Sequence, residues 1–155
     1  MVDEFDRSLR AELDYVVEAR ACEEIAAGFR DTPGVRFPWI EWDLTTSRVL
    51  TMQELSGLSG LRVDDLAGLD AAGIDREELA YRAADVLLAM VFEHGVFHAD
   101  PHAGNLFIEP DGTVGFIDFG SVGRISPSLR RRFAGLAMAL ARQDTDGLVR
   151  ALLDI

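Results

Sequence analysis

The stretch His98-Ala99-Asp100-Pro101-His102-Ala103-Gly104-Asn105, followed further along by Asp118-Phe119-Gly120, carries most of the information in this chain. An Asp and an Asn five residues apart on one loop can hold a reacting hydroxyl or water and a metal ion side by side. A second Asp that leaves a short β-hairpin can bind the same metal. Either motif alone is a weak signal, whereas the two in this order and at this spacing are a strong one.

The residues between the two motifs are typical of a β-hairpin. Apolar runs at 106–108 and 113–117 flank the turn sequence Glu109-Pro110-Asp111-Gly112. A hairpin brings its two ends together, so we expect Asn105 and Asp118 to lie close in space. Two converging oxygen ligands suit Mg²⁺, which takes a few protein oxygens together with phosphate oxygens.

Each polar residue of these motifs has a functional and a structural interpretation. Asp100 is the candidate catalytic base or water-positioning residue, and Asn105 and Asp118 are the candidate metal ligands; the alternative is a polar loop with capping side chains. For His98 we favour a structural role that fixes the loop backbone over a role as catalytic base. His102 stays open between a turn role and a role in binding metal or phosphate.

Composition limits the compartment and the partners. The chain has 155 residues, 48% of them hydrophobic, and a formal net charge of −12. These values indicate one compact domain with a real core, and they disfavour nucleic acid as a partner. Cys22 is the single cysteine, which excludes an intrachain disulfide and favours a reducing cytoplasm. No run of 18 apolar residues and no signal peptide are present, so we expect no transmembrane segment.

Apolar periodicity and end signals predict a mixture of helices and strands. The first helix carries an apolar stripe that includes Val16, Val17 and Ile25. Asp75 and Glu78 have capping-box spacing at the start of the second long helix. The predicted elements are helices at 4–29, 75–93, 126–142 and 145–153, hairpin strands at 39–44 and 48–53, and a hinge with a short helix within 54–69.

Four segments together resemble the UbiB-like (aarF-domain) atypical kinases. They are residues 12–19 (ELDYVVEA), 48–52 (RVLTM), 97–106 (FHADPHAGNL) and 117–120 (IDFG). The resemblance runs nearly end to end and implies an α+β, protein-kinase-like fold that is partial. Residues 1–155 would be one partial kinase-like domain, with 1–53 as a remnant of the small lobe and 54–155 as the large lobe.

The resemblance also implies an activity and a cellular setting. Members of the family bind ATP or ADP with Mg²⁺, act as ATPases or as small-molecule or lipid kinases, and support isoprenoid quinone biosynthesis (ubiquinone or menaquinone) or lipid homeostasis. The implied partners are a nucleotide, a prenyl lipid or a quinone-pathway protein. The implied location is the cytoplasm, peripheral to the inner face of the membrane.

The resemblance also implies roles for individual residues, which are matched to the motifs of the family one by one. Asp100 resembles the catalytic-loop Asp, and Glu18 resembles the small-lobe helix glutamate that contributes to the cofactor site. Spacing alone favours surface positions for the N-terminal acids, although Asp14 and Glu18 share a helix face. The remaining correspondences are the cofactor and metal ligands Asn105 and Asp118, the E-x-D residues Glu12 and Asp14, and the motif residues His98, Gly104, Phe119 and Gly120.

Two departures from the wider kinase pattern matter. The family's K-x-G-Q motif, Ala-rich nucleotide loop and small-lobe lysine belong before the helix where this chain begins, and the chain contains no lysine. We therefore expect a truncated domain: a fragment, a split gene product or a degenerate protein. We expect such a chain to be inactive alone or to take the missing small lobe from a partner chain. Ala99 stands where protein kinases have Arg, and few residues separate Gly120 from the next helix, which argues against a protein substrate.

Two other functions compete with this interpretation. Aminoglycoside or choline phosphotransferases also use an H-x-D-x-x-x-x-N loop and an Asp-led metal motif. The Asp118-Phe119-Gly120 tripeptide and the segment from Glu12 to Glu18 favour the UbiB type over these enzymes. A catalytically inactive, pseudokinase-like binding module is the alternative from a different class, and the missing small-lobe strands support it.

Overall fold

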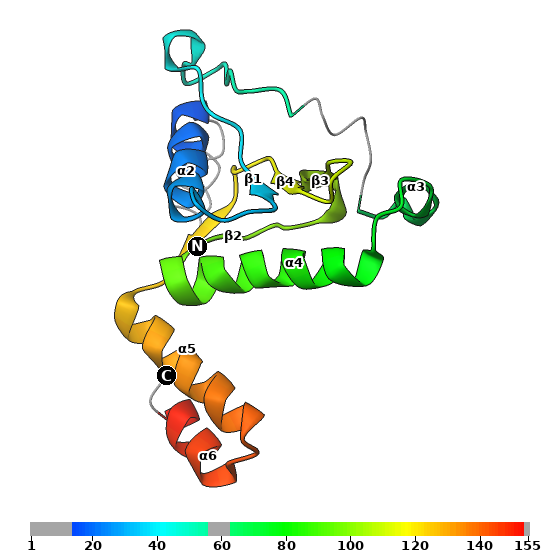
Figure 1. Ribbon diagram of the computed structural model, residues 1–155. Coiled ribbons are helices and arrows are strands. Elements are labelled where there is room, and N and C mark those ends of the chain that lie inside the picture. Colours follow the sequence, from blue (N-terminus) through cyan, green and yellow to red (C-terminus); the bar gives the residue numbers. More distant parts are fainter. Residues whose placement is uncertain (1–13, 56–62, 154–155) are drawn as a thin grey trace.

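The computed structural model describes residues 14–55 and 63–153 and shows an α+β protein in which helices surround two small sheets (Figure 1). This confirms the fold class expected from the sequence. The elements in chain order are α2 (Tyr15–Gly28), β1 (Val35–Arg36), the 3-10 helix η1 (Trp42–Leu44), α3 (Leu66–Ala71), α4 (Arg76–Ala89), the π-helix η3 (Met90–His94), β2 (Val96–His98), the 3-10 helix η4 (Ala103–Asn105), β3 (Leu106–Ile108), β4 (Val114–Phe116), β5 (Val122–Arg124), α5 (Pro127–Ala141) and α6 (Thr145–Leu153).

The two sheets surround the motif-bearing loop. In the first sheet, β4 is central, antiparallel to β3 and parallel to β1, with Leu106 opposite Phe116 and Val35 opposite Val114. The predicted hairpin between the motifs is therefore confirmed. In the second sheet, β2 and β5 pair antiparallel on either side of the two motifs. Strands β1, β2 and β5 were not predicted, because runs of two or three residues show no period.

Side-chain caps set the helix starts where the sequence indicated. Asp75 accepts hydrogen bonds from the backbone N–H groups of Glu77 and Glu78 at the start of α4, and Ser126 caps α5. A full capping box would also have the Glu78 side chain accept from the backbone N–H of Asp75. Glu78 instead pairs with Arg82 at 2.8 Å. The predicted bounds of the last two helices agree with α5 and α6.

The predicted strands at 39–44 and 48–53 are wrong in part. The segment does double back, with backbone hydrogen bonds from Glu41 N to Thr51 O and from Gln53 N to Trp39 O. It forms only isolated bridges, however, and its first half contains η1. The Thr45 hydroxyl donates to Glu41 O at 2.8 Å, a local bond that competes with a regular ladder.

The first predicted helix is found from Tyr15 onward, and its start at residues 4–13 lies outside the described residues. Its predicted stripe is wrong at Val17, which is 48% exposed, whereas Cys22 and Ile25 are buried. Burial and the neighbouring Glu23 and Glu18 charges raise the pKa of the Cys22 thiol to about 12, so this cysteine is an inert core residue.

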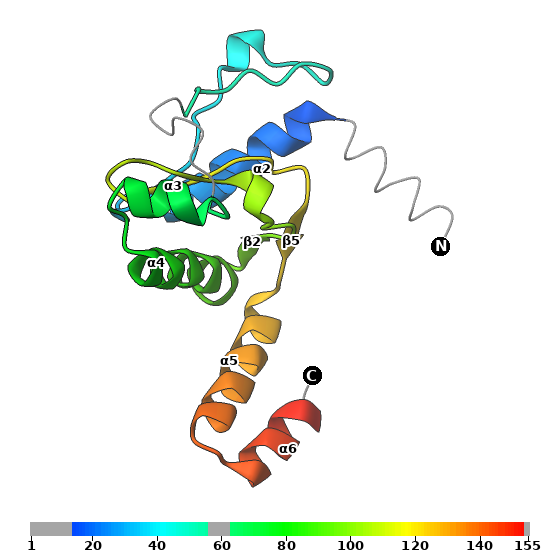
Figure 2. The same cartoon turned by 90° about the vertical axis from the view of Figure 1, so that its right-hand side faces the viewer.

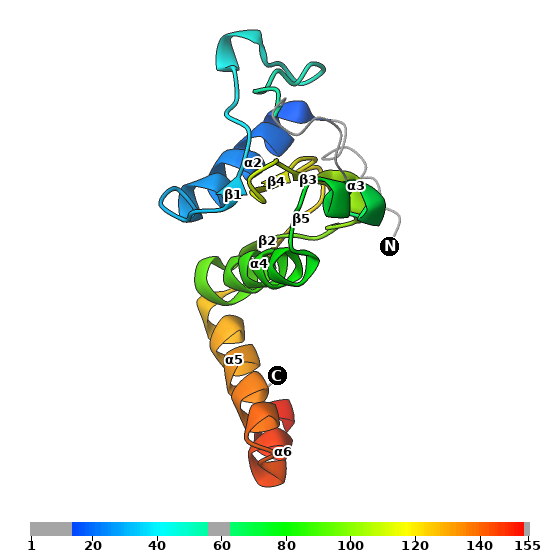
Figure 3. The ribbon, with the colours of Figure 1, turned by 45° about the vertical axis from the view of Figure 1, so that its right-hand side comes forward.

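The core lies between α2, α4 and the first sheet. Phe37 contacts Phe29, Phe116 and Phe119 with ring centroids 5.4 to 6.0 Å apart, which joins the sheet to the end of α2. Helix α4 runs below the strands in the view of Figure 3, and α5 and α6 extend away from this body as a helical hairpin (Figure 2). Among the described residues, no helix has the length and apolarity that a membrane span needs.

Candidate functional site

His98 fixes the first motif onto the sheet. Its side chain is buried, with Nδ1 accepting from Asp100 N at 3.2 Å and Nε2 lying 3.2 Å from Ile117 O. Both contacts are satisfied only by the neutral tautomer with the proton on Nε2, which then donates to the Ile117 carbonyl. His98 thus ties the backbone of the Asp100 loop to the residue immediately before Asp118.

Asn105 connects the two motifs a second time. Its side chain is 5% exposed, and Nδ2 donates to Asp100 O at 3.3 Å. Its own backbone carbonyl accepts from Ile117 N at 3.0 Å, where β3 and β4 meet. Because Nδ2 is committed to the loop, the orientation of the amide leaves Oδ1 as the atom that can bind a cation.

Asp118 has an unusual backbone that the sequence could not reveal. Its φ of 60° lies in the left-handed region, which is uncommon outside glycine. Asp118 Oδ1 accepts from Gly120 N at 3.3 Å, and a Cβ added at Gly120 would lie 3.3 Å from that oxygen. The strained turn and the small residue together leave the Asp118 carboxylate exposed at the end of the hairpin.

Glu18 reaches the second motif from α2. Its Oε1 accepts from Phe119 N at 3.2 Å, across 101 positions of sequence. Burial raises the pKa of Glu18; the hydrogen bond from Phe119 opposes this shift, and the Asp118 charge adds to it. The described residues include no ion pair to Glu18, so its half-buried carboxylate faces Asp118 without a cation.

Asp100 and His102 form the exposed part of the loop. His102 Nδ1 accepts from Gly104 N at 3.0 Å, and His102 Nε2 lies 3.8 Å from Asp100 Oδ2. A Cβ at Gly104 would come within 2.7 Å of the His102 ring, so the ring position requires glycine there. The arrangement orients His102 toward the Asp100 carboxylate, which no residue of the described chain covers.

Of the two N-terminal acids of the family motif, the structure describes only Asp14, at the start of α2. Asp14 accepts from Val16 N at 3.0 Å and caps α2, which is a structural role. Glu12 lies outside the described residues.

Three arginine contacts hold β5 and the hairpin in place, two ion pairs and one hydrogen bond, and the sequence carried no signal for them. Arg124 lies on β5, the strand that follows the second motif, and pairs with Glu24 on α2 at 2.5 Å. At the other end of the hairpin, Arg36 pairs at 2.8 Å with Glu109, whose side chain is almost fully buried. Arg82 donates to Gly112 O at 2.6 Å. The partners are 30 to 100 positions apart, so local patterns gave no signal.

The assembled donors fit a magnesium–nucleotide site. Asn105 Oδ1 and the Asp118 carboxylate are hard oxygen atoms, and their residues lie at adjoining ends of β3 and β4. The described residues contain no cluster of three His, Cys, Asp or Glu side chains that could hold a metal. A Mg²⁺ ion here would therefore take most of its ligands from phosphate and water, which is its usual preference.

Comparisons with known proteins identify the family of this chain. A chloroplastic Arabidopsis thaliana protein named ACTIVITY OF BC1 COMPLEX KINASE 8 is 35% identical over 99% of this chain and 20% of its own length. An uncharacterized Mycobacterium tuberculosis protein is 40% identical over 90% of this chain and 29% of its own length. This chain thus spans less than a third of either relative.

A solved structure supports the fold. The Mycobacterium tuberculosis protein Rv3197, solved in complex with erythromycin, matches with a TM-score of 0.63 and 24% identity, covering 97% of this chain and 37% of that one. A model of the ABC1 atypical kinase-like domain matches residues 1–152. The resemblance found in the motifs is thereby confirmed, and the chain belongs to the ABC1 atypical kinase-like family.

Proposed function

We propose that this chain carries the metal and catalytic half of a Mg²⁺–ATP-dependent phosphotransferase or ATPase. The observation that carries the proposal is the set of cross-motif hydrogen bonds. Asn105 and His98 tie the Asp100 loop to the start of the second motif, and Glu18 ties α2 to Phe119. These hydrogen bonds link residues from separate elements, which a polar loop with simple capping roles would not require, and they support the proposal.

The proposed roles follow from exposure and donor chemistry. The exposed Asp100 carboxylate orients a hydroxyl or water and accepts its proton. Asn105 Oδ1 and Asp118 bind the metal of the nucleotide, and bound Mg²⁺ would neutralise charge on the phosphates. The buried neutral His98 does not move a proton in this scheme; it holds the loop.

The Glu18 carboxylate has no cation beside it among the described residues, which indicates the group that a complete site would add. A half-buried carboxylate with a raised pKa is stabilised by a nearby cation, and the chain contains no lysine. We propose that a further segment or a partner chain supplies that cation and the cover over the phosphates. Nucleotide affinity of this chain by itself should accordingly be weak.

The biological setting is proposed from family membership alone. The name of one relative refers to activity of the bc1 complex. We propose a role in isoprenoid quinone biosynthesis or lipid homeostasis, with a prenyl lipid or a quinone-pathway protein as partner. The proposed location is the cytoplasm, at the inner face of the membrane.

The test separates binding from turnover. Binding of Mg²⁺–ATP and Mg²⁺–ADP is measured by calorimetry, and turnover is measured after the upstream segment of a longer relative is joined to this chain. Asp100→Asn should lower turnover by about 10²-fold or more while leaving nucleotide binding nearly unchanged. Asp118→Asn should instead weaken the Mg²⁺-dependent part of binding.

The control is Asp111→Asn, a fully exposed aspartate at the far end of the same hairpin. It should leave both binding and turnover unchanged. Equal effects of Asp100→Asn and Asp118→Asn on binding would contradict the proposed division of roles. Nucleotide binding without any turnover would favour the pseudokinase-like module.

A further inference from the structure

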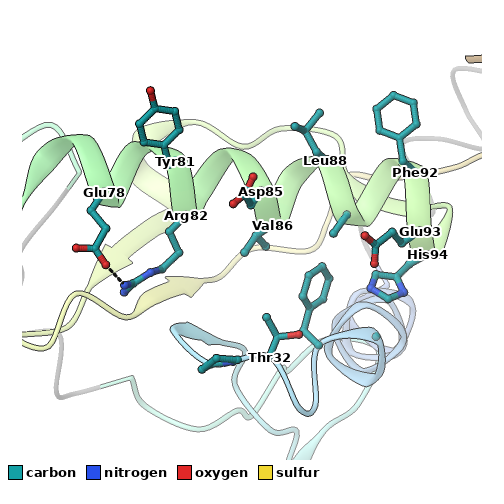
Figure 4. Close-up of a pocket in the computed structure, with 14 residues that line it drawn as sticks. Thr32, Glu78, Tyr81, Arg82, Asp85, Val86, Leu88, Phe92, Glu93 and His94 are labelled. Carbon is teal, nitrogen blue, oxygen red and sulfur yellow. Dashed lines mark hydrogen bonds and ion pairs between the residues drawn. The ribbon is translucent and has the colours of Figure 1, made fainter. Parts of the chain in front are cut away.

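Helix α4 presents an apolar stripe with acidic side chains along a cavity of about 680 Å³. Tyr81 and Leu88 are 66% and 53% exposed, and they point to the same side of the helix as Phe92 (Figure 4). Their spacing of seven and four positions is that of a helix–helix contact. Asp85 and Glu93 also line the cavity, and neither carboxylate has an ion-pair partner among the described residues.

The α5–α6 hairpin has the complementary character. Leu129, Phe133, Leu136 and Leu140 recur on α5 at steps of four, three and four positions, and Leu140 is 66% exposed. Residues 127–153 contain five arginines and only two aspartates, in a chain whose net charge is −12. The hairpin is therefore a basic amphipathic element on an acidic protein.

The two stripes cannot meet within one molecule as the chain is arranged. Arg130 Nη1 donates a short hydrogen bond to Glu93 O, and Ile125 N donates to Gly95 O at 2.9 Å. These bonds fix the start of α5 to the end of η3, and from there α5 extends away from the body of the protein (Figure 1). Folding α5 back onto α4 would break both bonds, so the α4 stripe stays free for another molecule.

We propose that two copies of this chain associate by seating the α5 stripe of each copy on the α4 stripe of the other. The apolar side chains supply the buried area, and the basic hairpin faces the acidic groove. A two-fold arrangement makes the same contact twice and closes the assembly at a dimer. The proposal concerns an interface and does not depend on the proposed catalytic function.

The test measures mass and self-affinity of the purified chain by light scattering and sedimentation equilibrium. The wild-type chain should reach twice its 17.0 kDa mass as concentration rises. Leu88→Glu on α4 and Leu140→Glu on α5 should each weaken the dimer by about tenfold or more. The matched control is Leu44→Glu, because Leu44 is 62% exposed and belongs to neither stripe. Circular dichroism checks that each variant folds.

A mixing experiment identifies the pairing. Leu88→Glu retains a native α5 stripe and Leu140→Glu retains a native α4 stripe, so a mixture can form one intact contact. The mixture should associate more tightly than either variant alone. Three outcomes would overturn the proposal: a wild-type chain that stays monomeric, including one that instead co-sediments with anionic phospholipid vesicles; a dimer that survives Leu88→Glu; or a mixture no tighter than its components.

Discussion

Two segments of this chain have the sequence signature of a hairpin, and only one of them becomes a regular sheet. Residues 106–116 form β3 and β4, with β1 as a third strand, and Val114 and Phe116 are fully buried. Residues 39–53 form isolated bridges around a 3-10 turn, and Trp42 and Val49 remain 39% and 53% exposed. Two strand-like runs separated by turn residues therefore indicated chain reversal in both cases, whereas tertiary neighbours decided whether a regular ladder formed.

Turn chemistry separates the two segments as well. In the first, Gly112 has φ +80° and its carbonyl is bound by Arg82, while Asp111 Oδ1 accepts from Thr113 N. In the second, the Thr45 hydroxyl accepts from Thr51 N and donates to a local carbonyl, which draws the backbone into a turn. A glycine at the left-handed position is thus a stronger hairpin signal than a run of threonines.

The largest expected difference is in core packing. Phe116→Ala removes a ring with no exposed surface and should lower the free energy of unfolding by about 3–5 kcal/mol. Trp42→Ala removes a half-exposed ring and one hydrogen bond to Glu23, so we expect a loss of about 1 kcal/mol. Urea unfolding followed by circular dichroism measures both.

A chain that fails to fold as Phe116→Ala can be tested as Phe116→Leu, which keeps most of the buried volume. Similar losses for the Phe116 and Trp42 variants would show that residues 39–53 are as well packed as the hairpin. That result would contradict the contrast drawn from their exposure.

The next effect is at the turn of the hairpin. Gly112→Ala forces a Cβ into a left-handed conformation and places it 3.3 Å from Arg82 Nη1, so the variant should lose about 1–2 kcal/mol. Gly73→Ala is the matched control, because Gly73 has φ +72° and nothing within 4 Å of an added Cβ. A loss at Gly112 no greater than at Gly73 would leave Arg82 without a role in fixing the turn.

The same contrast explains how far the sequence predicted the fold. The hairpin between the motifs and the helix starts at Asp75 and Ser126 were predictable because each depends on residues a few positions apart. The strands β1, β2 and β5 were not, because each consists of two or three residues held by distant partners. Val17 was misplaced because a stripe on one helix cannot show which side meets the core.

The sequence predicted which residues form the candidate site, and it gave no signal of how their backbones and contacts are arranged. The motif spacing indicated that Asp100, Asn105 and Asp118 lie near one another, and the hydrogen bonds through Ile117 are consistent with that expectation. The left-handed backbone of Asp118 and the contact from Glu18 to Phe119 had no local signature. The roles proposed for these residues remain predictions.

A smaller effect, on the pH dependence of stability, distinguishes the two glutamates of α2 that accept hydrogen bonds from other segments. Glu18 holds the exit of the hairpin from a half-buried position, whereas Glu23 holds Trp42 from an exposed one. Because the pKa of Glu18 is raised in the folded protein, the fold binds this proton more tightly than the unfolded chain does. The Glu18 contribution to stability is therefore present below its ordinary pKa and lost as pH rises through the raised value.

Glu18→Gln keeps an oxygen that accepts from Phe119 N and should abolish this pH dependence. Urea unfolding between mildly acidic and neutral pH should show the wild-type free energy falling relative to the variant as pH rises. Glu23→Gln is the matched control for loss of one negative charge on the same helix. A wild-type curve parallel to that of Glu18→Gln would mean that Glu18 is not held in a desolvated position.

The smallest expected effect is the pH dependence of stability that Asp111 contributes at the hairpin turn. Its direction is opposite to that of Glu18. The backbone hydrogen bond from Thr113 lowers the pKa of Asp111, so its ionised form favours the folded state above the ordinary pKa, and this advantage is lost as pH falls through the lowered value. Asp111→Asn keeps an acceptor for Thr113 N but removes the charge, and it should be less stable than wild type at neutral pH and equal to it in acid. Thr46→Ala removes the comparable acceptor for Val49 N in residues 39–53, where no carboxylate is involved, and its loss should not depend on the Asp111 titration. A carboxyl titration of Asp111 by NMR with a midpoint at or above the ordinary value would contradict the turn geometry, because the Thr113 bond can lower the pKa only while the turn is closed.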